Sequence, residues 1–317
     1  MLAVMPIFHG FGLGICIHTS LCFGLKAIVQ PKLEVQNFDQ LIMDYKPNMI
    51  TGVPTIYEYL IQSKKLDNFD LSFLKWVSSG GDSLSTNMKH KITKFLKDRG
   101  SKVGVKEGYG LTECVTGTCL MPKDIDRDGS IGIPYTDTIY KIVEPDTFKE
   151  LKYGEVGEII INSPTIMLGY LGNEEETKKA LRKDKDNNIW FYTGDLGYIS
   201  EDGFVYYKGR IKRMIISSGY NVYPDQIENL IEQHKDVLIS SVVGIPDEKK
   251  GEFPVAFIVF NNIDNQQESL KNIEEDVKSN VSKYAIPKKY IIIDKIPKTP
   301  VGKVDYNQLI EIYKKDK

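Results

Sequence analysis

Two short runs in the middle of the chain carry residue types that could grip a small polar ligand. The run Tyr192–Leu196 reads Tyr-Thr-Gly-Asp-Leu, and Gly209 and Arg210 begin fourteen residues after Asp195. A carboxylate accepts two hydrogen bonds at once, so an aspartate in a glycine-flanked turn suits the vicinal diol of a ribose. Because Thr-Gly-Asp is also a good turn sequence, a purely structural β-turn is the alternative for Asp195 taken alone.

A second constellation, residues 107–113, reads Glu-Gly-Tyr-Gly-Leu-Thr-Glu. Tyr109 offers a flat apolar face, and Gly110 lets the backbone approach a ligand closely. Thr112 adds a hydroxyl group. Glu113 adds a carboxylate of the kind that binds Mg²⁺, a cation that favours oxygen ligands and phosphates. An ordinary loop between a strand and a helix is the structural alternative, since Tyr-Gly is unremarkable in such a loop.

Four blocks in this order resemble the adenylate-forming superfamily, which includes acyl-CoA synthetases, aryl-CoA ligases and adenylation domains. The blocks are 109–113, 192–196, 209–212 and 302–303, and the resemblance covers essentially the whole chain. It implies an acyl-CoA synthetase that uses ATP, Mg²⁺ and CoA. A fatty or aryl carboxylic acid would first become acyl-AMP with release of pyrophosphate, and CoA would then displace AMP to give acyl-CoA.

The resemblance also implies roles for individual residues of a nucleotide site. Asp195 would bind the ribose, Thr112 would donate to the α-phosphate, and Glu113 would hold Mg²⁺. Lys303 would be the catalytic lysine beside Thr112 and Glu113, because its ammonium neutralises charge that builds up in the transition state. A surface lysine is the alternative, since the C-terminal tail is rich in lysine. The implied nucleotide-binding residues are Gly81, Asp82, Glu107, Gly108, Tyr109, Gly110, Thr112, Asp195 and Arg210.

The acyl side of the pocket is assigned, again by resemblance, to His9, Gly52 and Val53. A lone histidine beside aromatic residues often only packs or satisfies a hydrogen bond, so this is the alternative for His9. For Gly52 and Val53 the alternative is a plain strand end.

The resemblance further implies a hinge at Lys212, about which a C-terminal module swings between two poses. One pose would bring Lys303 to the nucleotide for adenylation. The other would bring the loop with Ser218 and Gly219 there, as the channel for CoA, and Gly219 would leave room for the pantetheine chain.

The elements that must position these residues alternate between strands and helices over the first 120 residues. Segments 48–53 and 76–82 are typical of strands that end in loops. The next segment, 84–96, has apolar residues at helical spacing and ends before Gly100, with Asp82 or Ser83 as its N-terminal cap. This order predicts a mostly parallel sheet, which binds ligands at the C-terminal ends of its strands.

From residue 131 the pattern changes to short strands, at 158–161, 190–192 and 204–207, with a turn at 201–203. These predict a small β-barrel or a distorted sheet. After Lys212 strands and helices alternate, and Pro224 occupies a tolerated first-turn position of a helix.

The predicted fold class is therefore α/β: a partial, mostly parallel sheet subdomain plus a small β-barrel, followed by a mobile α+β C-terminal domain. The predicted divisions are 1–211, made of 1–130 and 131–211, and 212–317.

Composition excludes several classes of function. The net charge of the 317 residues is −2, which provides no electrostatic footprint for nucleic acid or an anionic membrane. The cysteines form no CxxC pair, so we expect no zinc site, and their irregular use fits a reducing cytoplasm. They are Cys16, Cys22, Cys114 and Cys119.

The first 25 residues contain no charged side chain, so a signal peptide or membrane helix must be weighed. No basic region precedes the apolar stretch 11–29, and several glycines and Lys26 interrupt it. We therefore expect a buried strand at 2–7, a glycine-rich loop and a buried helix, with no transmembrane segment.

The superfamily carries a phosphate loop rich in Ser, Thr and Gly, which ends in Pro-Lys-Gly. It precedes a further block, which residues 5–12 around His9 resemble here. Segment 78–81 lacks the length and the lysine of such a loop. We therefore expect a truncated chain with an uncovered apolar face, or one half of a split enzyme that works with a separate N-terminal chain. A non-catalytic nucleotide- or acyl-binding protein is the alternative class. Within the enzyme class, peptide-synthetase-like or D-alanyl-carrier adenylation stays open, although segment 218–224 favours acyl-CoA ligases.

Overall fold

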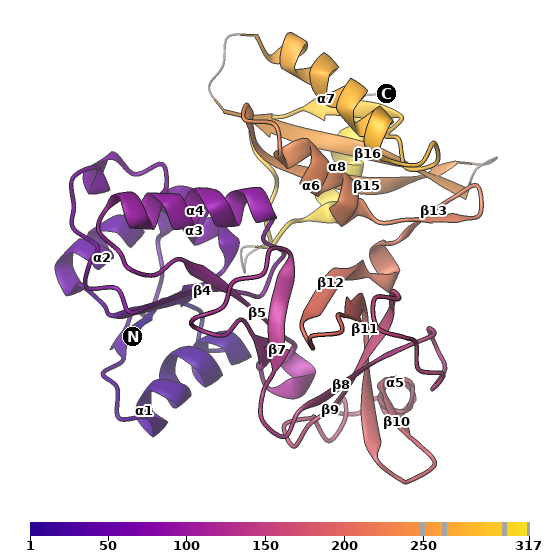
Figure 1. Cartoon of the computed structure of the whole chain (residues 1–317), viewed down its shortest axis with the longest axis horizontal. Coiled ribbons are helices and arrows are strands. Elements are labelled where there is room, and N and C mark those ends of the chain that lie inside the picture. The colour runs from indigo at the N-terminus through magenta and orange to yellow at the C-terminus, as the bar shows by residue number, and fades with distance from the viewer. Residues whose placement is uncertain (248–250, 262–264, 300–302, 316–317) are drawn as a thin grey trace. The chain divides into compact units, whose positions relative to one another are not determined.

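The computed structural model describes residues 1–247, 251–261, 265–299 and 303–315. The chain divides into two compact units. The first unit holds Met1–Thr193 and Gly197–Tyr207, and the second holds Gly194–Leu196 and the chain from Lys208 onward (Figure 1). The change at Lys208 lies close to the predicted boundary at Lys212, and a hinge at that residue stays a prediction.

Five parallel strands begin the first unit, in the order β2-β1-β3-β4-β5. Parallel neighbours need long crossover connections, which here contain the helices. Figure 1 shows α2, α3 and α4 on one side of these strands and α1 on the other. This arrangement confirms the predicted parallel sheet. The elements are β1 (Leu2–Ala3), a π-helix (Phe11–Thr19), α1 (Ser20–Cys22), β2 (Ile28–Val29), α2 (Phe38–Tyr45), β3 (Met49–Gly52), α3 (Pro54–Leu60), β4 (Trp76–Ser79), α4 (Thr86–Asp98) and β5 (Val105–Gly110).

Helix α4 forms where apolar residues recur at helical spacing, and its side chains Ile92 and Leu96 are fully buried. Gly100 follows the helix with φ +84°, as expected of a residue just past a helix end. The predicted cap was wrong, because the N-cap is Ser85, whose hydroxyl accepts from the Met88 N–H at 3.3 Å. The Asp82 carboxylate accepts instead from the adjacent Ser83 N–H, at 2.9 Å.

The apolar N-terminal stretch differs from the prediction in its details. The first strand ends at Ala3 rather than at residue 7, and helical structure already begins at Phe11. Several large apolar side chains of this stretch are exposed, including Phe8 and Phe23. Among the helices that the structure describes, none is long and apolar enough to cross a membrane.

The sheet continues from β5 with strands that are mainly antiparallel, in the order β5-β6-β7-β12-β11-β9-β8, and β10 pairs with β11. The strand order is open, with β8 at its end, so the predicted distorted sheet describes these strands better than the predicted β-barrel does. The turn at 201–203 is confirmed, with Gly203 at φ +85°. The elements are β6 (Gly117–Leu120), β7 (Ser130–Pro134), β8 (Ile139–Val143), β9 (Gly157–Asn162), α5 (Glu174–Ala180), β10 (Leu181–Lys183), β11 (Ile189–Ile199) and β12 (Val205–Arg210).

The second unit contains a sheet of the order β14-β13-β16-β15, with β17 parallel to β16. Apolar residues of α6 and α7 pack on one side of it, and those of α8 pack on the other. Pro224 opens α6 as predicted, whereas β15 and α8 were not predicted. The elements are β13 (Ile215–Ser217), β14 (Tyr220–Val222), α6 (Pro224–Glu232), β15 (Val237–Asp247), β16 (Gly251–Phe260), α7 (Gln266–Asn280), β17 (Lys289–Ile292) and α8 (Tyr306–Lys315).

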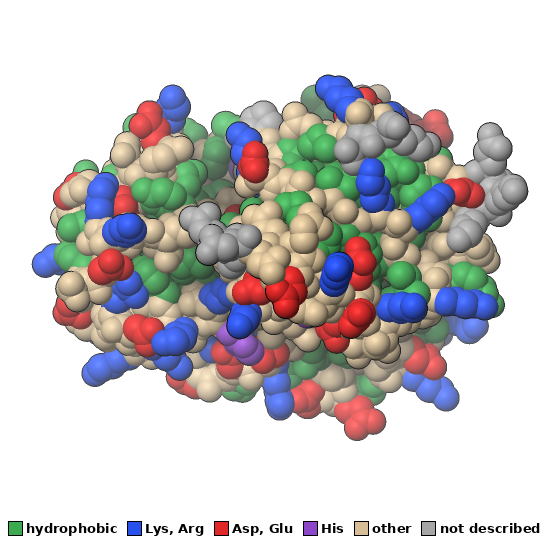
Figure 2. Space-filling view, turned by 90° about the horizontal axis from the view of Figure 1, so that it is seen from above, with side chains coloured by type: hydrophobic (Ala, Val, Ile, Leu, Met, Phe, Trp, Pro, Cys, Tyr) green, Lys and Arg blue, Asp and Glu red, His purple; other side chains and the backbone are tan. Residues whose placement is uncertain are grey.

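Figure 2 shows that acidic and basic side chains are interspersed on one face of the molecule.

Candidate active site

Two loops of the first unit, those after β3 and β4, meet each other and strand β5. A Cβ placed on Gly81 would lie 3.5 Å from Val53 Cγ1, so the loops after β3 and β4 touch. A Cβ on Gly80 would lie 2.9 Å from the Gly108 carbonyl oxygen, which joins the loop after β4 to β5. The structure thus brings Gly81, a predicted nucleotide residue, next to Val53, a predicted acyl-pocket residue. It also brings the loop that holds Gly81 next to Gly108 on β5.

The acyl-side candidates lie at the same end of the sheet. A Cβ on Gly52 would lie 3.7 Å from the sulfur of Met5, so the end of β3 adjoins the segment that leads to His9. His9 Nδ1 accepts a hydrogen bond from the Phe11 N–H at 3.1 Å. That bond gives His9 a structural role at the start of the π-helix. Its place in an acyl pocket stays a prediction.

Gly110 is required by the fold itself. A Cβ at this position would lie 1.7 Å from the Thr116 carbonyl oxygen, which accepts from the Leu111 N–H at 3.0 Å. The Tyr109 ring lies 6.1 Å from the ring of Tyr207 and 6.4 Å from that of Tyr140. Aromatic packing therefore fixes the orientation of Tyr109.

Thr112 and Glu113 follow β5 in a short 3₁₀ turn, Thr112–Cys114, in which Thr112 is exposed. The Tyr170 hydroxyl donates to Glu113 Oε1 at 2.8 Å, and the Met167 N–H donates to the Glu113 backbone oxygen at 2.7 Å. Burial, followed by the neighbouring Glu113 carboxylate, raises the pKa of Tyr170 to about 12, so the phenol stays a donor near neutral pH. Sequence reasoning missed Tyr170, which lies 57 residues from Glu113.

Val115 closes this turn with φ +67° and ψ −38°. A β-branched residue with positive φ is a genuine outlier and costs roughly 1–3 kcal/mol. The surrounding structure therefore holds the turn in a conformation that the residue itself does not favour.

Glu107 lies on β5 and is buried with a lysine that sequence reasoning did not single out. Lys89 of α4 is 1% exposed, and its Nζ lies 3.4 Å from Glu107 Oε1, 2.6 Å from Asp126 Oδ1 and 3.7 Å from Asp128 Oδ1. Burial raises the pKa of Glu107 to about 7, against the opposing effect of Lys89. Burial by itself lowers the pKa of Lys89, but the Glu107 and Asp126 carboxylates outweigh it and the pKa is raised. This pairing gives Glu107 a structural explanation beside the predicted nucleotide contact.

Asp195 does not lie in a turn, and this part of the prediction was wrong. It lies inside strand β11, after Gly194 with φ +70°, and is 2% exposed. The strand continues through Gly194 because glycine tolerates the left-handed conformation at no steric cost. Arg210 Nε lies 3.2 Å from Asp195 Oδ1, so the structure pairs two of the predicted nucleotide residues with each other.

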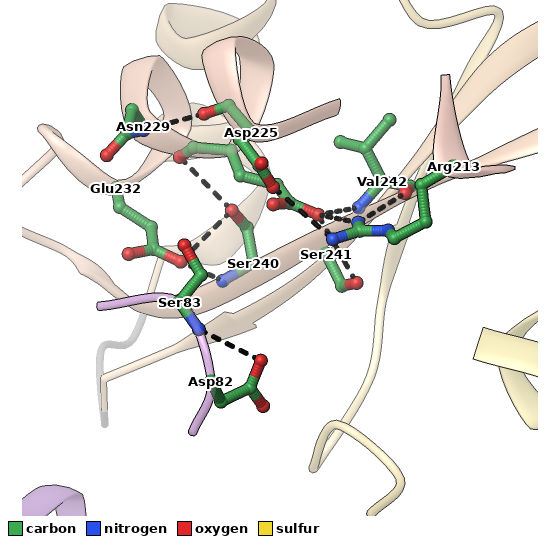
Figure 3. Close-up of polar contacts among 10 residues, drawn as sticks. Asp82, Ser83, Arg213, Asp225, Asn229, Glu232, Ser240, Ser241 and Val242 are labelled. Carbon is green, nitrogen blue, oxygen red and sulfur yellow. Dashed lines mark hydrogen bonds and ion pairs between the residues drawn. The ribbon is translucent and has the colours of Figure 1, made fainter. Parts of the chain in front are cut away.

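The chain around the predicted hinge is tied to α6 in the second unit. The Arg213 guanidinium lies 3.3 Å from Asp225 Oδ1 and 3.1 Å from Glu228 Oε1, and it stacks 3.9 Å from the centre of the Tyr306 ring. Figure 3 shows Arg213 and Asp225 facing each other across this network. Lys212 itself is exposed.

Ser218 and Gly219 form the two-residue turn between β13 and β14, with φ of +53° and +81°. Positive φ at both central residues is typical of a type I′ hairpin turn, which favours glycine. A Cβ on Gly219 would meet no atom within 4 Å. The conformation of the turn therefore explains this glycine without a passing ligand, and the predicted CoA channel stays a prediction.

Lys303 is half-buried in the second unit. Its N–H donates to Thr299 Oγ1 at 3.2 Å, and its carbonyl oxygen accepts from the Thr299 N–H at 2.7 Å. Gly302, which precedes it in the predicted motif, lies outside the described residues.

Comparison with known families decides what kind of protein this is. Residues 1–171 match the family described as AMP-binding enzyme, and residues 226–303 match the AMP-binding enzyme C-terminal domain. The chain belongs to the AMP-binding enzyme family. The first match lies within the first unit and the second within the second unit.

Curated proteins whose names give different activities are similar to this chain in sequence. A long-chain-fatty-acid–CoA ligase of Bacillus subtilis is 34% identical over 314 residues, which are 98% of this chain and 54% of the relative. A luciferin 4-monooxygenase of Luciola mingrelica is 32% identical over 99% of this chain and 56% of the relative. The chain thus spans about half the length of the curated relatives it matches.

Among solved structures, the ATP-bound MatB of Rhodopseudomonas palustris has a TM-score of 0.86 with 30% identity. The match covers 99% of this chain and 60% of that chain. It confirms the fold class of an adenylate-forming enzyme.

Proposed function

We propose that this chain forms part of an AMP-forming acid–CoA ligase and contributes most of its nucleotide site. The observation that carries the proposal is that the loops after β3 and β4 meet each other and strand β5, which leads directly into the turn with Thr112 and Glu113. Open parallel sheets bind ligands at the C-terminal ends of their strands. The resemblance assigns Asp195 and Lys303 of the second unit to the same reaction.

The proposed reaction has two steps. An oxygen of the substrate carboxylate attacks the α-phosphorus of ATP, the bond to pyrophosphate breaks, and acyl-AMP forms. The sulfur of CoA then attacks the acyl carbonyl carbon, its proton leaves to solvent or a base, and AMP departs. In the first step the Thr112 hydroxyl would donate to an α-phosphate oxygen, and the Lys303 ammonium would neutralise charge on the transferring group. The Asp195 carboxylate would hold the ribose diol.

Mg²⁺ would suit Glu113 as its protein ligand and would supply charge neutralisation on the phosphates. Glu113 offers a hard oxygen donor, and of its two carboxylate oxygens the Tyr170 hydroxyl engages Oε1. Within the ranges that the structure describes, no group of three or more His, Cys, Asp or Glu side chains could hold a metal by itself. A cation that shares one carboxylate with substrate phosphates fits this arrangement.

The acid substrate and the acceptor are also part of the proposal. We place a fatty or aryl carboxylic acid on the side of His9, Gly52 and Val53, and free CoA as acceptor. The proposed location is the cytoplasm. In support, the four cysteines are free, and Cys22 is exposed while the other three are buried. Unbridged thiols are typical of a reducing compartment.

The test is acyl-CoA formation by the 317-residue chain, measured by mass spectrometry with ATP, Mg²⁺, CoA and a panel of short, long and aromatic acids. Acid-dependent exchange of pyrophosphate into ATP reports the first step separately. The matched control is Lys303→Ala beside Lys298→Ala, a nearby lysine of the same tail. Product that disappears with Lys303→Ala alone would support the proposal.

Two other outcomes distinguish the alternatives. Binding of ATP without pyrophosphate exchange would favour a non-catalytic nucleotide-binding protein or one half of a split enzyme with a separate N-terminal chain. Exchange without acyl-CoA would favour a carrier protein as acceptor.

A further inference from the structure

The segment Met167–Asn173 contacts the candidate metal ligand at two separate points. The Tyr170 hydroxyl donates to the side-chain Oε1 of Glu113 at 2.8 Å. The Met167 N–H donates to the backbone oxygen of Glu113 at 2.7 Å. One contact therefore fixes the carboxylate and the other fixes the peptide that carries it.

This segment is itself anchored at both ends. Ile166 and Met167 pack against the apolar core of the antiparallel strands. At the other end the Tyr170 N–H donates to Thr177 Oγ1 at 2.8 Å, and the Thr177 hydroxyl donates to the Asn173 carbonyl oxygen at 2.8 Å. The Asn173 side chain also caps α5 by accepting from the Glu176 N–H at 3.1 Å. The phenol thus reaches Glu113 from a segment that is fixed by the apolar core on one side and by α5 on the other.

A hydrogen bond to one oxygen removes rotational freedom from a carboxylate. With Oε1 held by the phenol, Oε2 is presented in a defined direction, and in residues 1–247, which the structure describes throughout, no hydrogen bond of Oε2 is seen. Outer partners of this kind orient metal ligands and tune their affinity. Val115 adds a second constraint, because its strained turn limits movement of the peptide after Glu113.

We propose that Tyr170 is a positioning residue for the divalent cation that accompanies the nucleotide: its hydroxyl holds Glu113 so that the second carboxylate oxygen faces the metal. The inference rests on the proposed function, since it concerns the metal–nucleotide site of the same enzyme. It adds a residue from a segment that none of the four sequence blocks contains.

The experiment is isothermal titration calorimetry of ATP into the full chain, once with excess Mg²⁺ and once with EDTA. The ratio of the two dissociation constants isolates the metal-dependent part of the affinity. The variants are Tyr170→Phe, which removes only the hydroxyl, Glu113→Gln, and Tyr153→Phe as a control for loss of an exposed phenol. Thermal unfolding of each variant verifies that it is folded.

We expect Tyr170→Phe to reduce the metal-dependent ratio by about 10-fold and to leave the EDTA value unchanged. We expect Glu113→Gln to reduce the ratio further and Tyr153→Phe to leave it unchanged. If Tyr170→Phe matches Tyr153→Phe while Glu113→Gln loses the Mg²⁺ effect, the inference is wrong and the proposed function stands. Equal weakening with Mg²⁺ and EDTA would mean a general structural role and would also overturn the inference. If Glu113→Gln keeps the Mg²⁺ effect, or the chain binds no ATP, the proposed metal–nucleotide site fails and the inference fails with it.

Discussion

Lys89 and Glu107 make a prediction about stability that depends on pH in a defined direction. Replacing Lys89 by Met keeps a chain of similar length in α4 but removes the cation that faces Glu107, Asp126 and Asp128. Removing one partner of a buried ion pair costs about 3–5 kcal/mol, because the other charge stays buried without compensation. The two aspartates are about half exposed, so each contributes about 1 kcal/mol or less to this loss.

The sign of the pH dependence follows from Glu107. Its pKa is raised from the ordinary 4.5 to about 7 in the folded chain, so the native state holds this proton more tightly than the unfolded state does. The stability that results is fully present below about pH 4.5 and is lost as the pH rises through about 7. The difference between the two values corresponds to roughly 3 kcal/mol. Without Lys89 the Glu107 pKa would rise further, because Lys89 is a cation that opposes the effect of burial.

We therefore expect Lys89→Met to lower the free energy of unfolding by about 1 kcal/mol at pH 5, where Glu107 is protonated in both proteins. At pH 8 we expect a loss of about 2–2.5 kcal/mol, because the variant's Glu107 takes up a proton instead of keeping an unpaired charge, and one pH unit above the wild-type pKa of about 7 adds at most about 1.4 kcal/mol. Urea unfolding followed by tryptophan fluorescence measures this. Both tryptophans, Trp76 and Trp190, lie in the first unit, so the signal reports the unit that contains the ion pair.

Glu107→Gln is the matched control, because glutamine has the shape of the protonated acid and does not titrate. The double variant Lys89→Met with Glu107→Gln should regain most of the stability lost at pH 8. A loss from Lys89→Met that is equal at pH 5 and pH 8, or one that the second substitution does not relieve, would refute the reasoning.

Three further predictions concern the proposed reaction and the turn that supports it. Asp195→Ala should weaken the use of ATP by about 10²–10⁴-fold, through the loss of two charged hydrogen bonds of roughly 1.5–3 kcal/mol each; ATP kinetics like those of the wild type would disprove the ribose assignment. Lys303→Ala should block formation of acyl-AMP and spare thioester formation from supplied acyl-AMP, and equal loss of both half-reactions would contradict that division. Gly110→Ala should lower the free energy of unfolding by about 1–3 kcal/mol, since its Cβ would lie 1.7 Å from the Thr116 carbonyl oxygen; unchanged urea midpoints would show that the loop yields easily.

Local sequence signals predicted the elements whose causes are local. Apolar spacing located α4, Pro224 located the start of α6, and residues 201–203 located a turn. The family blocks likewise gave the fold class, because their order along the chain is itself a property of the sequence.

Other features depend on contacts between distant residues, which a single sequence does not display. Lys89 pairs with Asp126, and Tyr170 bonds to Glu113 across 57 residues. Asp195 was expected in a turn because Thr-Gly-Asp suits one. The pairing of β11 with its neighbours overrides that local preference, and Gly194 supplies the left-handed residue that the strand needs.

The uneven exposure of the four free cysteines has a practical consequence. Burial raises the pKa of Cys16, Cys114 and Cys119, so these thiols stay protonated and are slow to react near neutral pH, whereas Cys22 of α1 is exposed. A maleimide dye would therefore mark one position of the natural sequence. Helix α1 belongs to the first unit and α7 to the second. A second dye, attached to a cysteine introduced at an exposed position of α7, would therefore allow single-molecule fluorescence to follow the distance between the two dyes as a measure of the predicted swing at Lys212.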